Sequence, residues 1–205
     1  MTPAGVPFVL PSSDLAEAIR QEWDEQKEFI RPDRMGLTQI ANTALDRVAS
    51  RQKEEIADLL RYAGTDLLCH RADGPEELVR LQEERWRPVL DWLREWIGAS
   101  FIVVRGVMPV DQPKESLAAM EAQLARSDAF HLAGIHLATH ALGSLFLAVA
   151  LAERRFSAAE VFTLSQIDEA YQRSFWGEDE EAKAREERLR EDVQTAGRFL
   201  TALGR

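Results

Sequence analysis

The sequence predicts a mainly α protein with a small α+β N-terminal part and a C-terminal helical bundle around a buried central helix. Apolar residues recur at helical spacing through most of the 205-residue chain, whereas residues 100–106 are β-branched and aromatic, as in a strand. Residues 129–152 contain no Asp, Glu, Lys or Arg, which is typical of a helix buried on all sides. We expect an N-terminal α+β region over residues 1–110 and a helical domain over residues 111–205.

Several helices are predicted in the N-terminal region. Ser12 can cap the first of them, which carries Leu15, Ile19, Glu22 and Trp23 at helical spacing. Two more helices are marked by apolar residues, one by Ile40, Ala44, Leu45 and Val48 and the next by Ile56, Leu59, Leu60 and Ala63.

A longer helical segment follows and leads to the predicted strand. Asp73 resembles a helix cap, and Pro88 is expected to re-set the helix before a Trp-rich stretch that Gly98 ends. "SFIVVRG" at 100–106 is the best strand candidate, because it lies between turn residues, and "DLLCH" at 66–70 is a second, shorter candidate.

The C-terminal helices are predicted from their caps and charges. A loop leads to a helix over residues 114–126, and Ser127 can then cap a long central helix that extends to residue 152. Ser157 and Glu160 form a capping box for the next helix. The last helix is highly charged, with acid-before-base pairs at Asp179–Lys183, Glu181–Arg185 and Glu186–Arg190. Such pairs are typical of a solvated helix face.

The composition excludes several classes of function. The formal net charge of −10 argues against a general binder of nucleic acid or anionic membranes, because those proteins use basic surfaces. Cys69 is the only cysteine, so an internal disulfide is excluded and a reducing compartment fits. The first residues lack the pattern of a secretory or transit peptide. We expect a cytoplasmic bacterial protein, or a mitochondrial matrix protein if the chain is a processed eukaryotic form.

The uncharged stretch 129–152 is long enough to be mistaken for a membrane span. Three His and two Gly lie inside it, and its strictly apolar part covers only residues 145–152. These features favour a buried helix in a bundle over stable membrane insertion.

The same stretch holds a pair of histidines at metal-ligand spacing. His136 and His140 stand four residues apart, so the alternative hypothesis for the chain is a small metal-dependent enzyme that uses this pair. The Glu that would serve as base after the first His is replaced by Leu137, and His131 faces away from the pair on a helix. We therefore expect no metal and no cofactor, with the pair linking polar atoms between packed helices and His131 meeting solvent.

Other catalytic signatures are missing from the sequence. Cys69 and His70 are adjacent, and adjacent residues on a strand point to opposite faces, so the two cannot act as thiol and base on each other. Cys69 is therefore expected to be a small buried hydrophobe. Neither a Gly-rich phosphate loop nor a G-x-S-x-G elbow occurs. The sequence therefore disfavours an ATP-driven machine and leaves an enzyme of another kind open.

The most informative segment is "LSQIDEAYQRSFWGEDEEA", residues 164–182. Its apolar stripe consists of Leu164, Ile167 and Tyr171, its polar groups are Asp168, Glu169 and Gln172, and it ends at Phe175, Trp176 and Gly177. Aromatics beside acids at a helix end are the kind of anchor that protein interfaces use. By periodicity alone, Trp176 also fits a core position, and both readings stay open at this point.

At this segment the chain resembles the ATP12-type assembly chaperones, which bind the alpha subunit of the ATP synthase catalytic head. Four other stretches resemble the family in its order, and they are "TPAGVPFVLPSSDLAEAIRQEWDEQ", "LTQIANTALDRV", "LLRYAGTDLLCHRAD" and "WRPVLDWLREWIGASFIVVRGVMPV". The resemblance covers nearly the whole chain. It departs from the family at its start, since the β-rich stretch that precedes "TPAG" is missing, and at His70 and Arg87.

The resemblance implies a chaperone that holds unassembled alpha subunit and shields its beta-facing surface until the beta subunit joins, with no nucleotide hydrolysis. We expect the chain to be a monomer. It implies partner-binding roles for Trp23, Asp168, Glu169, Tyr171, Gln172, Trp176 and Gly177. Trp23 and Asp168 match positions that the family treats as functionally sensitive. For Trp23 that sensitivity fits a structural role too, because a Trp on the apolar face of a helix is first of all a core residue.

Overall fold

The computed structural model describes residues 1–108, 110–177 and 179–204, and the Trp176 side chain lies outside this description. The described residues form the helices α1 (Ser13–Asp24), α2 (Gly36–Asp46), α3 (Gln52–Gly64), α4 (Glu76–Ile97), α5 (Lys114–Leu124), α6 (Ala129–Leu142), α7 (Leu145–Ala152), α8 (Ala158–Ser165), α9 (Ile167–Trp176) and α10 (Glu180–Leu203). Short 3-10 helices are η1 (Pro32–Arg34), η2 (Val48–Ser50) and η3 (Leu67–Cys69), and the strands are β1 (His70–Arg71) and β2 (Val104–Arg105). The prediction of a mainly α protein with a small α+β part is confirmed.

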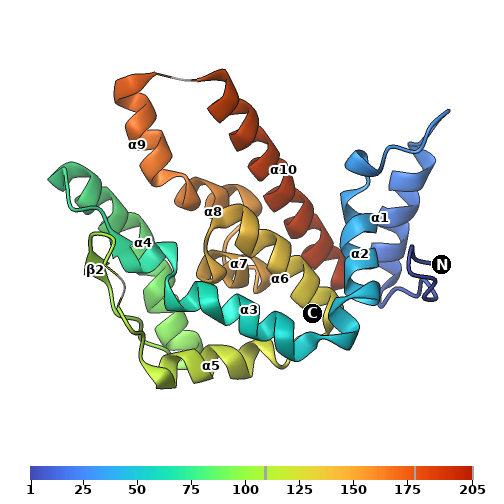
Figure 1. Ribbon diagram of the computed structural model, residues 1–205, viewed down its shortest axis with the longest axis horizontal. Helices are drawn as coiled ribbons and strands as arrows, with labels where there is room; N and C mark the ends of the chain where they lie inside the picture. The colour runs from blue at the N-terminus through green and yellow to red at the C-terminus, as the bar shows by residue number, and fades with distance from the viewer. Residues whose placement is uncertain (109, 178, 205) are drawn as a thin grey trace.

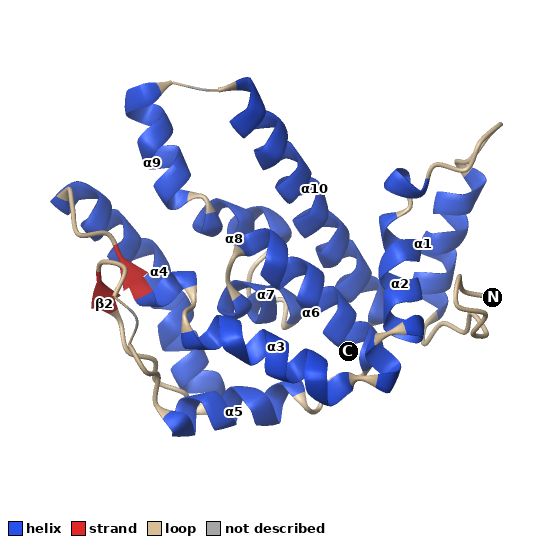
Figure 2. Ribbon diagram, in the orientation of Figure 1, coloured by secondary structure: helices blue, strands red, loops and turns tan. Residues whose placement is uncertain are grey.

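The two strands form a small parallel sheet, drawn in red in Figure 2, in which His70 lies opposite Val104. The predicted strand over residues 100–106 is therefore much shorter than expected. Side chains take the place of a neighbouring strand: Gln112 accepts from the backbone N–H of Ile102 at 2.8 Å and donates to its carbonyl at 3.0 Å. Because the Gln112 side chain satisfies the backbone groups of Ile102, this residue needs no hydrogen bonds from a neighbouring strand.

The predicted short strand over residues 66–70 is mostly helical. Leu67–Cys69 form η3, and only His70 belongs to β1. Asp66 accounts for the difference, because its carboxylate accepts a hydrogen bond from the Leu68 N–H at 3.1 Å and so caps a helical turn.

The predicted re-set at Pro88 is wrong, since α4 runs without interruption through this residue and ends at Gly98 in the left-handed region. A proline inside a helix leaves the carbonyl four residues earlier without its donor. Pro88 and Glu84 are both exposed, so that carbonyl lies on the solvated face of α4. The cost of the missing hydrogen bond is reduced there because water can supply the donor.

The predicted central helix is divided into α6 and α7 at Gly143, which has a φ of 65°. Asp128 caps α6 in place of the expected Ser127. At the start of α7, the buried Asp66 carboxylate accepts from the Ser144 hydroxyl at 2.7 Å and from the Phe146 N–H at 3.1 Å. Asp66 thus supplies acceptors for donors at the start of α7 inside the core, and the Ser144 side chain accepts from the Leu147 N–H.

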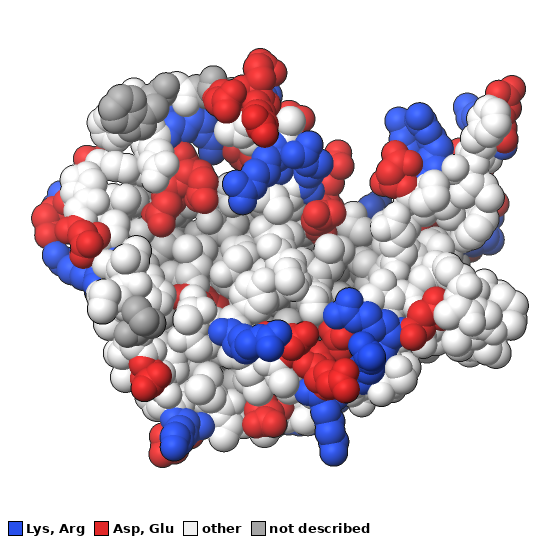
Figure 3. Space-filling view, in the orientation of Figure 1, with Lys and Arg blue, Asp and Glu red and all other residues white. Residues whose placement is uncertain are grey.

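The helix α6 lies at the centre of the fold and contacts α2, α3, α7, α8 and α10 (Figure 1). The prediction of a bundle around a buried central helix is confirmed. The surface over α6 is largely free of charged side chains in the view of Figure 3, in keeping with the uncharged sequence from residue 129 to 152. Within the described ranges, every helix is too short or too polar to cross a bilayer.

The close approach of α6 to α10 depends on Gly134. A Cβ atom at this position would lie 2.8 Å from Cδ2 and 3.0 Å from Cγ of Leu200, which is buried. We predict that Gly134→Val lowers the free energy of unfolding by about 2–3 kcal/mol, because over-packing of a core costs this much. The measurement is urea unfolding followed by circular dichroism. Gly64→Val in α3 is the control, because a Cβ there meets no atom within 4 Å; equal losses would contradict the prediction.

One hydrophobic core extends through both predicted parts of the chain. It includes Leu15 and Trp86 from the first part and Phe146 and Phe199 from the second. The division at residue 110 stays a prediction.

The helices α1 and α10 lie side by side. The helix α10 packs against both α1 and α2 (Figure 1). The Ser12 hydroxyl, which also caps α1, donates to the carbonyl of Ala202 at 2.6 Å.

Candidate functional site

The histidine pair links α6 to α3, as the sequence predicts. Nδ1 of His140 lies 3.0 Å from the Tyr62 hydroxyl, and Nδ1 of His136 lies 3.0 Å from a carboxylate oxygen of Glu55. Both partners belong to α3. Burial lowers the pKa of His136, His140 lowers it further, and Glu55 opposes the shift. His131 is half-buried rather than fully in solvent, and a hydrogen bond with a nearby carboxylate raises its pKa.

The geometry of the pair does not favour a shared metal ion. The rings of His136 and His140 are stacked, with centroids 4.5 Å apart and an interplanar angle of 22°. The nitrogen lone pairs lie in the ring planes. Two stacked, nearly parallel rings keep their lone pairs in separate planes, so the lone pairs do not converge on one ion. In the described part of the chain, no three His, Cys, Asp or Glu side chains are grouped to hold an ion.

Cys69 is fully buried, as predicted for a small core hydrophobe. Burial raises the pKa of its thiol to about 12, with the Asp66 carboxylate adding to the shift. Because the thiolate is the nucleophilic form, Cys69 is unreactive in this structure.

The base of α9 is fixed to α4 by Asp168. Nε2 of Gln82 donates to Oδ1 of Asp168 at 2.6 Å, and Oε1 of Gln82 accepts from the Ala72 N–H at 2.8 Å. Nearby, the Trp86 indole donates to the carbonyl of Leu164 at 2.8 Å. Gln82 is fully buried, so loss of its acceptor at Asp168 would leave a buried amide unsatisfied.

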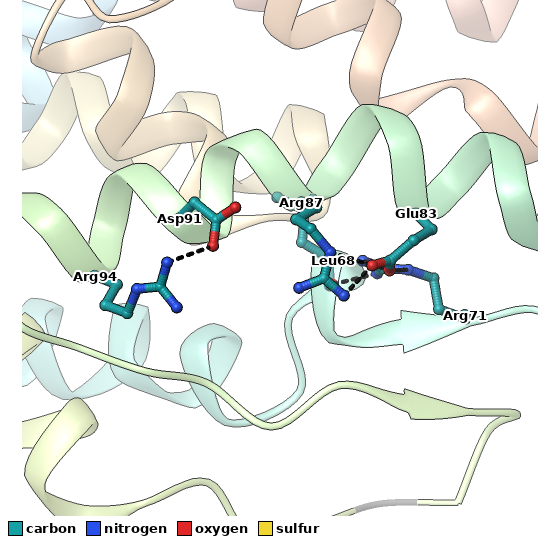
Figure 4. Close-up of polar contacts among 6 residues, drawn as sticks. All are labelled: Leu68, Arg71, Glu83, Arg87, Asp91 and Arg94. Carbon is teal, nitrogen blue, oxygen red and sulfur yellow. Dashed lines mark hydrogen bonds and ion pairs between the residues drawn. The ribbon is translucent and has the colours of Figure 1, made fainter.

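A second polar group holds β1 against the same part of α4 (Figure 4). The guanidinium of Arg71 donates to the carbonyl of Leu68 at 2.6 Å and to Glu83 at 3.0 and 3.1 Å, and Arg87 also contacts Glu83. Cζ of Arg71 lies 5.1 Å from the centroid of the Trp86 ring. Burial lowers the pKa of Arg71, and the hydrogen bond to Glu83 opposes this shift. These contacts fix β1 to α4, the helix to which Asp168 joins α9.

The far end of α9 presents an aromatic surface. Tyr171 is half-buried and packs on the core. The centroid of its ring lies 5.1 Å from that of Phe175, whose side chain is 66% exposed. Glu169 and Gln172 are exposed. Trp176 is the last residue of α9, and its side chain falls outside the described part of the structure, so its core and interface readings both stay predictions.

Gly177 ends α9 with a φ of 81°, a conformation that favours glycine. The apolar stripe of α9 thus continues to the helix end, beyond the part that rests on the core. Phe175 belongs to this stripe four residues after Tyr171 and was missing from the predicted site residues. The stripe's spacing was the signal that could have identified it.

Trp23 lies at the end of α1 and is 47% exposed. The expectation that it belongs to the core is wrong, because Glu22 occupies the buried position instead. The Glu22 carboxylate accepts from the N–H groups of Leu37 and Thr38 at 2.7 and 2.8 Å, so it caps the start of α2. In Figure 1, α10 lies between α1 and α9, so Trp23 and the α9 residues do not form one contiguous site.

A search of known proteins relates the whole chain to chaperones. The family model described as ATP12 chaperone protein matches residues 1–94. Atp12 from Paracoccus denitrificans is 39% identical, with a TM-score of 0.94 over 98% of this chain and 87% of that chain. A point mutant of P. denitrificans Atp12p is 38% identical, with a TM-score of 0.95 over 99% and 87% of the two chains. The Atu1473 protein of Agrobacterium tumefaciens is 43% identical, with a TM-score of 0.93 over 98% and 76%.

The helical fold and these relatives together define the class of protein as a chaperone. The chain belongs to the ATP12 chaperone family, whose members are chaperones of ATP synthase assembly.

Proposed function

We propose that this chain binds the unassembled alpha subunit of ATP synthase and shields its beta-facing surface until the beta subunit joins, by binding alone and without catalysis. The observation that carries the proposal is α9, which is rigidly fixed at Asp168 and exposes an aromatic end at Phe175 beside acidic residues. Exposed aromatics on a rigid support are typical binding anchors, because they bury a large area at low entropic cost.

The proposed contact residues are those that the sequence indicates, namely Asp168, Glu169, Tyr171, Gln172, Trp176 and Gly177, with Trp23 as a separate contact. The exposure of Trp23 supports a direct role better than a core role. The net charge of −10 would steer a basic surface of the partner toward the chain and disfavour acidic partners.

We further propose that the chain acts as a monomer in the bacterial cytoplasm, or in the mitochondrial matrix if it is a processed eukaryotic form. The single buried cysteine supports a reducing compartment of either kind.

The direct test is capture of separately expressed alpha subunit by the purified chain. We expect a soluble complex on gel filtration and reduced light scattering from alpha subunit alone, and both effects should disappear when beta subunit is added. If the chain neither captures alpha subunit nor lowers its aggregation, the proposed function is wrong.

Reversal of charge at Asp168 should separate binding from folding. We predict that Asp168→Lys weakens capture of alpha subunit about tenfold or more, because it removes an anionic contact and places a like charge before a basic partner. It should also lower the free energy of unfolding by about 1–2 kcal/mol, since Gln82 loses its acceptor. Asp168→Asn keeps an acceptor oxygen and is the control. Loss of cooperative unfolding in Asp168→Lys would instead make Asp168 a structural residue.

A further inference from the structure

A groove of about 810 Å³ runs between α4, α8 and α9. Its lining consists of Leu81, Glu84, Arg85, Pro88, Phe156, Ala159, Glu160, Thr163, Leu164, Ile167, Ala170, Tyr171 and Ser174. The helix α9 contacts both α4 and α8, so the walls are supported by direct packing. Most of the lining side chains are apolar or small.

The positions that line the groove follow helix geometry on all three sides. Residues 81, 84, 85 and 88 come from α4, residues 159, 160 and 163 come from α8 with Phe156 just before it, and residues 167, 170, 171 and 174 come from α9. The sets from α4 and α9 have the spacing i, i+3, i+4 and i+7, which is the stripe that a helix presents to another helix in a bundle. Residues 159 and 163 of α8 are four apart and so lie on one face of that helix. Three helix faces around one space leave a vacant position for a further helix.

The size of the groove favours a short helix over a second copy of this chain. Thirteen residues line it, whereas a stable dimer interface of standard size uses about 20–30 residues from each partner. A stripe from i to i+7 spans about 10 Å along a helix axis, or roughly two turns. The groove therefore matches one apolar stripe of a short amphipathic helix.

The charges around the groove favour basic flanks on that helix. Glu84, Arg85 and Glu160 are the charged lining residues, and Arg85 lies beside Glu84 with a closest distance of 4.0 Å. Their sum is negative, as is that of the whole chain. Lys or Arg on either side of an apolar stripe would complement this rim, whereas acidic flanks would be repelled.

We propose that this groove binds an amphipathic helix of the partner, with apolar residues at i, i+3, i+4 and i+7 and basic residues on its flanks. The identification of that partner rests on the proposed function, whereas the shape and charge of the occupant rest on the groove itself. Two polar contacts join the walls of the groove, since Gln82 of α4 donates to Asp168 of α9 and Trp86 of α4 donates to the carbonyl of Leu164 in α8.

A designed peptide tests the groove without the alpha subunit. The probe is a fluorescein-labelled helix of about four turns with Leu at i, i+3, i+4 and i+7 and Lys elsewhere. We expect saturable binding by fluorescence anisotropy. A peptide of the same composition with scrambled leucines keeps the charge and loses the stripe, so it should bind at least tenfold more weakly. Equal binding of the two peptides, or no binding of the first, would overturn the proposal.

Two groove variants locate the binding. Ala170 and Ala159 line the groove from α9 and α8 and are exposed, so Ala170→Trp should fill it and Ala159→Arg should repel a basic peptide without disturbing the core. Each should weaken binding of the striped peptide about tenfold or more. Ala118→Trp, at an exposed position of α5 outside the groove, is the matched control. Unchanged binding in both groove variants would place the peptide elsewhere and contradict the proposal.

Capture of alpha subunit provides a separate result. If the wild-type chain captures alpha subunit and the striped peptide competes with it, both proposals are supported. If alpha subunit is captured but Ala170→Trp and the peptide leave capture unchanged, the groove is not the partner's site and this inference is wrong. If alpha subunit is never captured, the proposed function is wrong, and the groove is still judged by the peptide.

Discussion

Asp66→Ala is expected to cause the largest loss of stability, roughly 3–5 kcal/mol. Asp66 is fully buried, and its carboxylate accepts from the Ser144 hydroxyl and from the N–H groups of Leu68 and Phe146. Alanine would leave these three donors without a partner in the core, and each unsatisfied donor costs about 1–3 kcal/mol. Urea unfolding followed by tryptophan fluorescence measures the effect.

Two controls define the cause. Asp66→Asn keeps an acceptor oxygen and should lose less than half as much stability, since burial already raises the pKa of Asp66 to about 6 and so disfavours its charge. Asp14→Ala, in the first turn of α1, removes an exposed carboxylate and should change the free energy of unfolding by less than about 1 kcal/mol. A loss at Asp66→Ala no larger than that of Asp14→Ala would show that the buried cap is dispensable.

Phe175→Ala is expected to have the largest effect on partner binding. Phe175 is 66% exposed at the end of α9 and touches only Tyr171 among the described aromatic rings, so its removal should leave the free energy of unfolding within about 0.5 kcal/mol. If it anchors the partner, capture of alpha subunit should weaken about tenfold to a hundredfold, the usual range for an aromatic anchor. Titration of labelled alpha subunit measures the affinity.

Val107→Ala is the control for this prediction, because Val107 is 92% exposed in the segment after β2 and is absent from the proposed contacts. It should leave capture unchanged. Similar losses for both variants would show that any exposed apolar residue contributes, and an unchanged affinity in Phe175→Ala would remove the end of α9 from the interface.

Local signals were sufficient for much of the helical structure. The capping box at Ser157 and Glu160 is present, and the stripe of Leu15 and Ile19 is buried. These features depend on residues close in sequence, so a pattern of caps and apolar spacing contains the information. The link from His136 and His140 to a neighbouring helix was predicted too, although the sequence did not identify α3 as the partner.

Features that depend on distant residues were beyond the sequence patterns. The division between α6 and α7 relies on Asp66, which is 78 residues from Ser144, and the shortened strand relies on Gln112. The candidate site shows the same limit. The polar residues of α9 were identified from one segment, whereas the groove beside them is assembled from three helices and includes Leu81 and Phe156.

The pairing of α1 with α10 has a consequence for synthesis on the ribosome. The helix α10, which packs against α1 and α2, leaves the exit tunnel long after both of them, and the contact from Ser12 to Ala202 forms only then. Until then the nascent chain exposes the parts of α1 and α2 that α10 contacts in the folded protein, and exposed apolar surface promotes aggregation. A member of a chaperone family thus passes through a stage at which its own N-terminal helices need protection.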